Sequence, residues 1–373
     1  MSKNTYKPRV EPAVGLHFNL NKLLTHKTFT LMKQTIFYAI ALTVMMAVGT
    51  NSHAASWRVN NDTTRGAQFA NINAAMSSAD VQDGDTLYLD PGSLITGNQN
   101  VTKCVTIIGN GYFSNALPYA LATIGGDLYL KAAHSKVYGV NLNSSVRVCA
   151  DYVTIERCKT NYIGYSSGTA RYAIIRNCYI RSTGDCIGGA GTSEERTFSW
   201  TIENNIIIAT SYSCISNLYS PIIRNNIFRK TNTSNYPTLS SMTNATVTNN
   251  IIVSGKQDYN FTNLVNCTVH HNVLSCAEGT YAEYPNNLCL GTTDFSTLFT
   301  MTGGNDEDYR FAEGSPAKGY ADFGGDCGPF DGAYPYIFGG MPLGVPYYTN
   351  AVIGSIAHDG KVNVSLKAII KDE

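Results

Sequence analysis

One irregular stretch of the sequence concentrates side chains that could do acid–base chemistry. Asp185 precedes the loop 191–200, which carries Glu194, Glu195 and Arg196. Neighbouring carboxyl groups can act as a general acid and a general base, and their oxygens could also hold a calcium ion. We therefore take Asp185, Glu194, Glu195 and Arg196 as candidate catalytic residues. A solvated charged loop is the alternative.

Aromatic and basic residues near this loop could bind a sugar. A phenol ring offers a flat apolar surface and a hydroxyl group, and an arginine pairs with carboxylates such as those of uronic acids. The candidate substrate-binding residues are Tyr162, Tyr165, Arg181, Tyr212 and Tyr219. The alternative is that these tyrosines only reflect the preference of tyrosine for β-strands.

Several other chemistries lack their sequence signals. His134, His270 and His271 are isolated from any Ser or Asp arrangement, and no CxxC pair or His/Cys spacing suggests zinc. No phosphate loop, dinucleotide motif or basic–aromatic patch is present, and 27 basic residues balance 27 acidic ones. We therefore expect no metal site or cofactor, apart from the calcium option, and no nucleic-acid partner.

The elements that must position these residues form a repeat. A β-branched pair, followed at a fixed offset by Asn or Cys, occurs six times between Val153 and Leu274. The final residues of the six copies are Cys158, Cys178, Asn205, Asn226, Asn250 and Asn272, at spacings of 20, 27, 21, 24 and 22 residues. A period of about 23 residues indicates a solenoid, in which each coil buries its apolar face against the next.

Each copy alternates apolar and polar residues, which predicts a strand with one buried face. The strand ends at an Asn-Asn, Arg-Cys or His-Asn pair, and a second apolar run follows directly. Because Asn tolerates the left-handed conformation, this pair predicts a tight corner, at which asparagines of stacked coils hydrogen-bond to one another. Cys158 and Cys178 should stack inside this corner rather than form disulfides, and Cys186 and Cys214 could stack likewise.

The positions just before the corners form a second column. They are Glu156, Arg176, Glu203, Arg224, Thr248 and His270, and the alternation predicts that they point outward. Glu and Arg on neighbouring coils would make a charge ladder that contributes about 0.2–1 kcal/mol per pair. A carbohydrate subsite is the alternative.

This pattern resembles the right-handed parallel β-helix of the pectin-lyase-like superfamily over roughly residues 57–335. The segments 69–94 and 308–332 resemble the entry and exit segments of such proteins. The resemblance implies an all-β fold, a single-stranded right-handed parallel β-helix with an N-terminal capping helix. The apolar stripe of that helix is Phe69, Ile72, Met76 and Ala79, and a C-terminal hairpin-like tail completes the fold.

The resemblance also implies where an active site would lie, on the strands that precede each repeat copy. These are residues 162–167, 185–190, 213–218, 238–243 and 261–266, and Asp185 is their only carboxylate. Lyases of this fold need a Lys or Arg base, and the hydrolases need several carboxylates. Both signatures are missing, so we expect a glycan-binding or structural, adhesive cell-surface module whose partner is a polysaccharide or cell-surface glycan. A polysaccharide lyase or glycoside hydrolase is the alternative.

The N-terminal region predicts export. Residues 32–55 read as a bacterial-type secretory signal, with Lys33, an apolar run and a small-x-small site. Residues 1–31 would be an extended N-terminus or a mis-assigned start, with a long charged region or a transmembrane anchor as alternatives. We expect an extracellular, cell-surface or periplasmic protein that is not inserted in the membrane after signal cleavage.

The mature chain divides into two parts in this interpretation. A β-helix domain spans residues 56–335, and a tail spans residues 336–373. The tail reads as two alternating strands around His358-Asp359-Gly360, which predicts a hairpin on or beyond the last coil.

Overall fold

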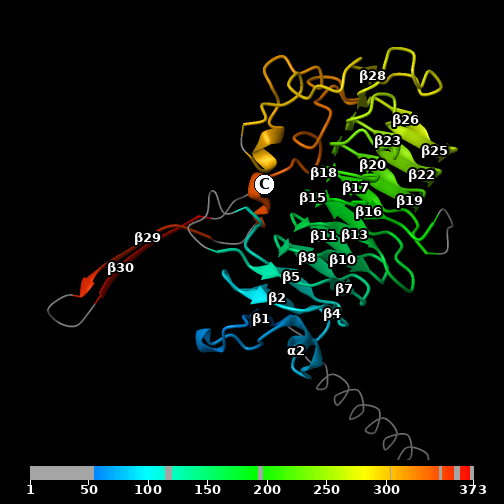
Figure 1. Cartoon of the computed structure of the whole chain (residues 1–373). Coiled ribbons are helices and arrows are strands. Elements are labelled where there is room, and N and C mark those ends of the chain that lie inside the picture. The colour runs from blue at the N-terminus through cyan, green and yellow to red at the C-terminus, as the bar shows by residue number, and fades with distance from the viewer. Residues whose placement is uncertain are drawn as a thin grey trace, which may run out of the picture. The chain divides into compact units, whose positions relative to one another are not determined.

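The computed structural model describes residues 54–113, 120–191, 196–302 and 304–343, together with the backbone of 347–356 and 362–369. Three long parallel sheets dominate these residues (Figure 1). Successive coils contribute one strand to each sheet, so that the chain forms a right-handed parallel β-helix. The predicted fold class is confirmed.

Sheet A contains the strands of the repeat copies and four earlier strands. It consists of β1 (Ser56–Val59), β2 (Thr86–Leu89), β5 (Thr106–Ile108), β8 (Lys136–Tyr138), β11 (Thr154–Glu156), β14 (Ile174–Arg176), β17 (Thr201–Glu203), β20 (Ile222–Arg224), β23 (Thr246–Thr248) and β26 (Thr268–His270). The solenoid therefore begins well before the six copies that are recognisable in the sequence.

Sheets B and C complete each coil. Sheet B consists of β3 (Leu94–Ile95), β6 (Thr123–Ile124), β9 (Asn141–Leu142), β12 (Lys159–Thr160), β15 (Tyr179–Ser182), β18 (Ile206–Ala209), β21 (Ile227–Lys230), β24 (Ile251–Ser254), β27 (Val273–Leu274) and β28 (Leu288–Cys289). Sheet C consists of β4 (Gln99–Val101), β7 (Leu128–Leu130), β10 (Ser145–Val148), β13 (Tyr162–Tyr165), β16 (Ile187–Gly188), β19 (Ile215–Tyr219), β22 (Leu239–Thr243) and β25 (Phe261–Val265).

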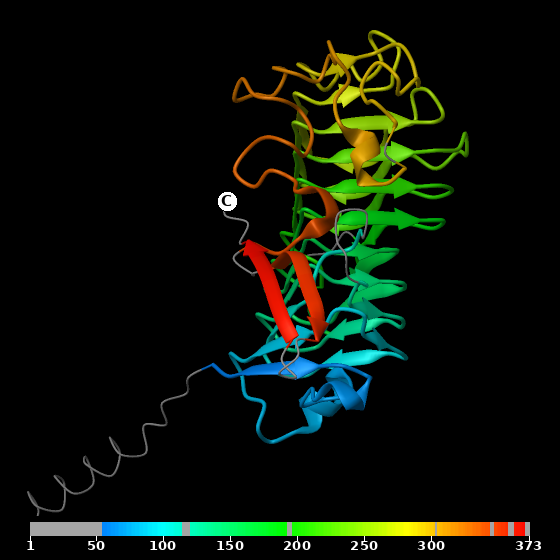
Figure 2. The same cartoon turned by 90° about the vertical axis from the view of Figure 1, so that its left-hand side faces the viewer.

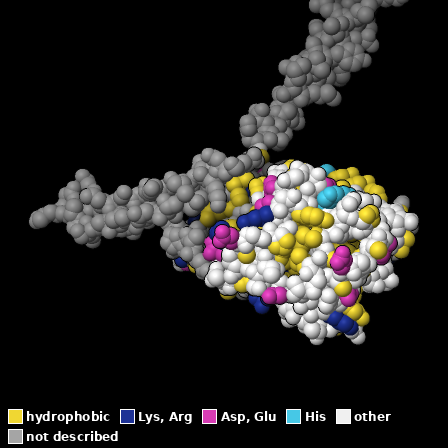
Figure 3. Space-filling model, turned by 90° about the horizontal axis from the view of Figure 1, so that it is seen from above, with side chains coloured by type: hydrophobic (Ala, Val, Ile, Leu, Met, Phe, Trp, Pro, Cys, Tyr) yellow, Lys and Arg dark blue, Asp and Glu magenta, His cyan; other side chains and the backbone are white. Residues whose placement is uncertain are grey.

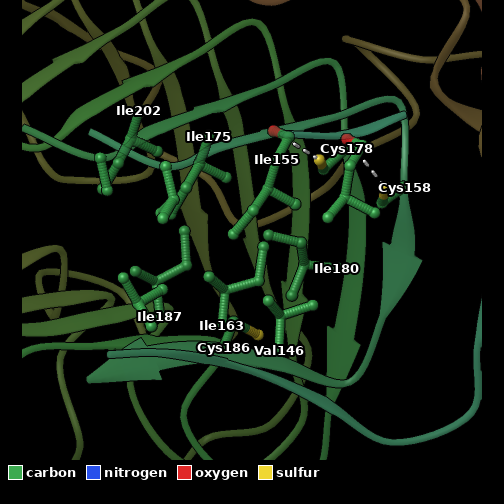
Figure 4. Close-up of a cluster of buried hydrophobic side chains, with 14 of the residues drawn as sticks. Val146, Ile155, Cys158, Ile163, Ile175, Cys178, Ile180, Cys186, Ile187 and Ile202 are labelled. Carbon is green, nitrogen blue, oxygen red and sulfur yellow. Dashed lines mark hydrogen bonds between the residues drawn. The ribbon is translucent and has the colours of Figure 1, made fainter. Parts of the chain in front are cut away.

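The core runs inside the stack and is filled by the inward side chains of all three sheets. Ile155, Ile175 and Ile202 from sheet A face Ile163 and Ile187 from sheet C (Figure 4). All five side chains have no exposed surface. Because one apolar residue per strand repeats in register, each coil buries its apolar face only when its neighbours are stacked on it.

The asparagine ladder lies at the corner between sheets A and B. The side chain of Asn205 donates to Asn226 Oδ1 at 2.9 Å, and Asn226 bonds to Asn250 in the same way. Asn250 donates to Asn272, and Asn272 donates to Asn287, a member that the repeat pattern did not include. The predicted ladder is therefore confirmed and extends one coil further.

Cysteines take the ladder position in two earlier coils. The thiols of Cys158 and Cys178 lie 3.6 and 3.5 Å from the backbone oxygens of Val137 and Ile155, inside the corner (Figure 4). Burial raises the pKa of the Cys178 thiol well above its ordinary value. All ten cysteines fall within the described residues, and each is a free thiol.

The second cysteine column is also present. Cys186 and Cys214 are both fully buried, and each precedes one member of the paired residues Ile187 and Ile215 of sheet C. The expected stacking of Cys186 and Cys214 on successive coils is confirmed.

The first residue of each corner pair has a left-handed backbone. The φ angles lie between 52° and 58° at Arg157, Asn177, Asn204, Asn225, Asn249 and His271. Four of these are asparagines, which tolerate this conformation better than most residues. Their side chains project away from the core, whereas the second residue of each pair points into the ladder.

A return segment, residues 322–342, runs back along this corner toward the first coils (Figure 2). The outward asparagines hold it. The hydrogen bonds join Asn249 to Asp322 (2.8 Å), Asn225 to Gly328 (3.5 Å), Asn204 to Pro329 and Asp331 (2.9 and 2.8 Å), and Asn177 to Tyr334 (2.8 Å). Pro342 reaches Gly139, where a Cβ atom would collide with its ring. Each Asn-Asn pair thus has one ladder residue and one clamp residue.

The sheet B strands β18 and β24 are buried on both faces. The outer residues Ile206, Ile227 and Ile251 of this sheet belong to a second apolar cluster with Phe299 and Tyr309 from the C-terminal chain. Strands that are covered on both sides read as continuous apolar runs, which explains the runs 206–209 and 251–254.

The charge ladder is confirmed, and its side chains point away from the core as predicted, but the two carboxylates are covered by other groups. Glu156 pairs with Arg176 at 2.7 Å, and Glu203 pairs with Arg224 at 2.7 Å. Glu156 and Glu203 are only 6% and 3% exposed, because arginines and the return segment cover this column. The ring of Tyr334 lies 4.0 Å from the Arg176 guanidinium.

The N-terminal end is capped by the short helix α2 (Ile72–Ser77). Ile72, Ala75 and Met76 bury against the first coils. The helix is shorter than the predicted stripe because Asn71 caps its start. Ala79 lies beyond the helix and is exposed.

The C-terminal tail forms the expected antiparallel hairpin of β29 (Tyr347–Ile356) and β30 (Val362–Ile369). Its packing on the last coil stays a prediction. The signal segment 32–55 and residues 1–31 lie outside the described residues, except for Ala54 and Ala55.

The ladder makes a specific prediction about stability. Asn226→Ala removes hydrogen bonds to both neighbouring coils and leaves the buried backbone N–H of Asn205 without its acceptor. We expect the free energy of unfolding to fall by about 3 kcal/mol, measured by denaturant titration with circular dichroism. Asn235→Ala, in an exposed loop, is the control and should cost less than about 0.5 kcal/mol. Equal losses in the two variants would contradict the ladder's role.

Candidate functional site

The outward face of sheet C carries the candidate residue Asp185. Asp185 lies two residues before β16 (Ile187–Gly188), and its carboxylate faces the next coil. The backbone N–H of Ser213 and the hydroxyl of Ser216 each donate to it at 3.0 Å. These two bonds fix the carboxylate on the sheet and leave its remaining lone pairs free to accept hydrogen bonds from a ligand hydroxyl.

Tyr162 lies flat on the same face. A Cβ atom added at either Gly164 or Gly188 would collide with its phenol ring, so the ring covers both glycines. Its hydroxyl lies 3.4 Å from the backbone oxygen of Gly188. Burial raises the pKa of this hydroxyl, so that the phenol is neutral and can donate a hydrogen bond. The two glycines are therefore the sequence feature that makes room for an aromatic platform.

Arg147 completes this platform from the preceding coil. Its guanidinium lies 5.2 Å from the centroid of the Tyr162 ring, and its Nε donates to Asp127 at 3.0 Å. Burial raises the pKa of the Asp127 carboxyl, but hydrogen bonds from Ser144 and Arg147 lower it by more, so that this pKa lies below its ordinary value. Asp127 is thus an anion that orients Arg147.

Small hydroxyl side chains continue the face beyond the platform. In the outward column of sheet C, Gly164 and Gly188 are followed by Ser216, Ser240 and Thr262. The hydroxyls of Ser213 and Ser240 lie 3.3 Å apart. We call the set Arg147, Tyr162, Asp185, Ser216 and Ser240 the sheet C site. It offers hydroxyl donors and acceptors, one carboxylate and one guanidinium over five successive coils, those of β10, β13, β16, β19 and β22.

The structure brings together only two of the residues expected from sequence, Tyr162 and Asp185. Tyr165 leans to the core side of the same strand and packs against buried residues, because residues three apart on a strand face opposite ways. Arg181 is an exposed residue of sheet B, away from Asp185. Arg196 is exposed in its loop, and Glu194 and Glu195 lie outside the described residues.

Tyr212 and Tyr219 lie near opposite ends of strand β19. Tyr212 is exposed and its ring lies 4.6 Å from that of Tyr236 on the next coil. Tyr219 ends β19, and its hydroxyl accepts a hydrogen bond from Asn244 at 3.0 Å. The two tyrosines therefore do not form one stripe with Tyr162.

The sequence interpretation missed an aromatic ladder at the corner between sheets C and A. The rings of His134 and Tyr152 stack at 4.9 Å, and those of Tyr152 and Tyr172 stack at 4.8 Å. One aromatic residue per coil, at spacings of 18 and 20 residues, was the available signal. Because the faces of the stacked rings contact one another, this ladder exposes mainly ring edges.

Arg147 and Asp127 were also missed. They lie 20 residues apart, one coil, and no charge pattern in the strand segments distinguishes them from other surface pairs. The pairing of Arg147 with Tyr162 depends on the glycine at position 164, which leaves space for the ring to turn toward it.

Metal binding has little support among the residues described. They include no group of three or more His, Cys, Asp or Glu side chains that could hold a metal ion. The calcium option involved Glu194 and Glu195, and it stays a prediction. His270 and His271 hydrogen-bond to one another through their Nδ1 atoms at 2.8 Å.

The surface near the end of the stack is sparsely charged. Figure 3 looks onto this end and shows scattered Lys, Arg, Asp and Glu side chains among polar and apolar ones.

In the part of the chain that is described, no helix has the length and apolar character needed to cross a membrane.

The sequence was compared with known proteins. No model of a known protein family matches the chain, and no curated protein is similar enough to count as a relative. The function must therefore be argued from the site itself.

The Asp127–Arg147 pair predicts a pH-dependent effect on stability. Because the pKa of Asp127 is lowered by folding, its carboxylate contributes stability that is present above the unfolded pKa, near 4. This contribution is lost as the pH falls through the lower folded pKa. Asp127→Asn should therefore lower the melting temperature at pH 7, and the difference from the wild type should shrink well below pH 4. Asp80→Asn, at an exposed carboxylate, is the control; a deficit that does not change with pH would contradict this assignment.

Proposed function

We propose that this is an exported glycan-binding protein, related to the pectin-lyase-like superfamily, that holds a saccharide chain along the outward face of sheet C. The observation that carries this proposal is the Tyr162 ring. It lies flat over Gly164 and Gly188, beside the Arg147 guanidinium. A fixed phenol can stack on the C–H face of a sugar ring at low entropic cost and hydrogen-bond its hydroxyls.

Two other outer surfaces of the solenoid are covered, which supports sheet C as the binding face. The outer side of sheet B packs against the C-terminal chain, and the return segment covers the corner between sheets A and B. The sheet C site has no such cover among the described residues. Its side chains repeat at the coil spacing of about 4.8 Å, so an extended ligand along the solenoid axis would meet one polar group after another.

The chemistry of the sheet C site favours binding over catalysis. Asp185 is bonded by Ser213 and Ser216, and Arg147 is bonded by Asp127. Neither is paired with a second catalytic group among the described residues of this face. An inverting hydrolase needs a second carboxyl, and the sequence candidates for it, Glu194 and Glu195, lie outside the described residues. A lyase or hydrolase that uses Asp185 with the loop 191–200 remains the second candidate.

Export is part of the proposal and is supported by the sequence alone. The segment 32–55 has the charged start, apolar run and small-residue site of a secretory signal. A chain with 14% charged residues and many Asn, Ser, Thr and Tyr side chains suits contact with neutral polysaccharides. The ten cysteines do not argue for this location, because all are free thiols, six of them buried and four half-buried.

Tyr162→Ala tests the proposal. We expect the affinity for an oligosaccharide identified from a panel of neutral and uronic-acid glycans to fall at least about tenfold, equivalent to about 1.4 kcal/mol. The reason is the loss of the aromatic ring that lies over Gly164 and Gly188. The measurement is isothermal titration calorimetry with the purified protein.

Tyr172→Ala removes an exposed aromatic ring from the neighbouring corner and should leave the affinity unchanged. New reducing ends or unsaturated ends that disappear in Asp185→Ala would show catalysis and replace the binding proposal by the enzymatic one. Unaltered affinity in Tyr162→Ala would remove sheet C as the binding face.

A further inference from the structure

A separate pocket lies between the solenoid and the return segment, on the other side of the coils from the sheet C site. Its volume is about 280 Å³. Sheet A and its corner supply one wall through Glu203, Arg224 and Thr248, and the return segment supplies the other through Asp322 and Phe323. This volume is at the low end for small-molecule sites, so it suits a ligand of about one sugar ring.

Phe323 is the unusual residue of this pocket. Its side chain is 51% exposed although it is large and apolar. A Cβ atom at Gly325 would collide with both the Phe323 ring and the Asp331 carboxylate. The missing side chain at position 325 therefore lets the ring lie against the turn, with its free surface toward solvent and the pocket. An aromatic surface held open in this way is a stacking platform rather than part of a core.

The polar groups around the platform are held in place by hydrogen bonds among the residues that line the pocket. The Asp322 Oδ1 atom accepts from Asn249 at 2.8 Å, and the Asp322 backbone N–H donates to Asn249 Oδ1 at 3.0 Å. The Arg224 Nε and Nη2 atoms both donate to Glu203, at 2.9 and 2.7 Å, while the arginine side chain is still 46% exposed. Oriented groups that lose no freedom on binding are the feature of a preformed site.

The charge of the lining selects the class of ligand. Glu203 and Arg224 neutralise one another as an ion pair, and Asp322 adds one negative charge. An anionic ligand such as a uronate or a phosphate would meet this carboxylate at short range, which is unfavourable. A neutral sugar ring can stack on Phe323 and donate its hydroxyl protons to Asp322.

We infer that this pocket is a second glycan site, which binds a single neutral sugar residue on Phe323 with Asp322, Arg224 and Thr248 as its polar partners. It is independent of the sheet C site, because none of its lining residues belongs to sheet C. A protein with both sites holds two glycan segments at once, or two parts of one branched glycan.

The test uses the full chain with glucose, galactose, mannose and N-acetylglucosamine as probes, and saturation-transfer NMR and calorimetry as readouts. At least one of these sugars binds the wild type, and Phe323→Ala weakens that binding at least about tenfold. Phe323→Tyr keeps an aromatic ring at this position and binds the sugar as the wild type does. Glucuronate binds more weakly than glucose, and Asp322→Asn reduces this difference.

Melting curves confirm that each variant is folded, and Phe323→Leu replaces Phe323→Ala if the alanine variant is not. Failure of all four sugars to bind, or equal binding in wild type and Phe323→Ala, overturns the inference. Tyr162→Ala separates the two proposals. It removes oligosaccharide binding to sheet C and leaves monosaccharide binding intact, so either site can fail without the other.

Discussion

The left-handed residue at the corner between sheets A and B is the constraint on which the rest of the structure depends. A positive φ costs a non-glycine residue about 1–2 kcal/mol, and six successive coils accept it. In the central coils asparagines offset that cost twice. The second Asn of a pair joins the internal ladder, as Asn226 does, and the first Asn, such as Asn204, clamps the return segment. One tight corner therefore fixes both the register of the coils and the path of the C-terminal chain.

That path decides which surfaces remain for function. The C-terminal chain buries the outer face of the central sheet B strands, and the return segment covers the Glu156 and Glu203 column. Ion pairs and the Tyr334 ring satisfy those carboxylates, so the most conspicuous charges of the sequence are structural. Two surfaces remain among the described residues. One is sheet C, where Gly164 and Gly188 make room for the Tyr162 ring, and the other is the pocket under the return segment, which Phe323 lines.

The fold was predictable because its signals are local. Period-two alternation gives the strands, and the Asn at a fixed offset gives the corner and the ladder. The return segment could not be predicted, because its clamps join residues 73 to 157 positions apart in the sequence. The burial of Glu156 and Glu203 follows from that long-range contact and was missed for the same reason. At the site, strand alternation separates Tyr162 from Tyr165, which the sequence interpretation grouped together. The role of Tyr162 depends on the absence of side chains at Gly164 and Gly188. It could not be predicted, because a glycine in a strand does not indicate which neighbouring side chain covers it.

The central claim is that sheet C, and not the corner between sheets A and B, is the face that holds a saccharide chain. Hydrogen–deuterium exchange of the whole protein, with and without a bound oligosaccharide, measures this directly. The account predicts slower exchange in the sheet C strands around Tyr162, Ile187 and Ser216 and in the turns beside them, with unchanged exchange in sheet B. Protection confined to sheets A and B, with sheet C unaffected, would contradict it.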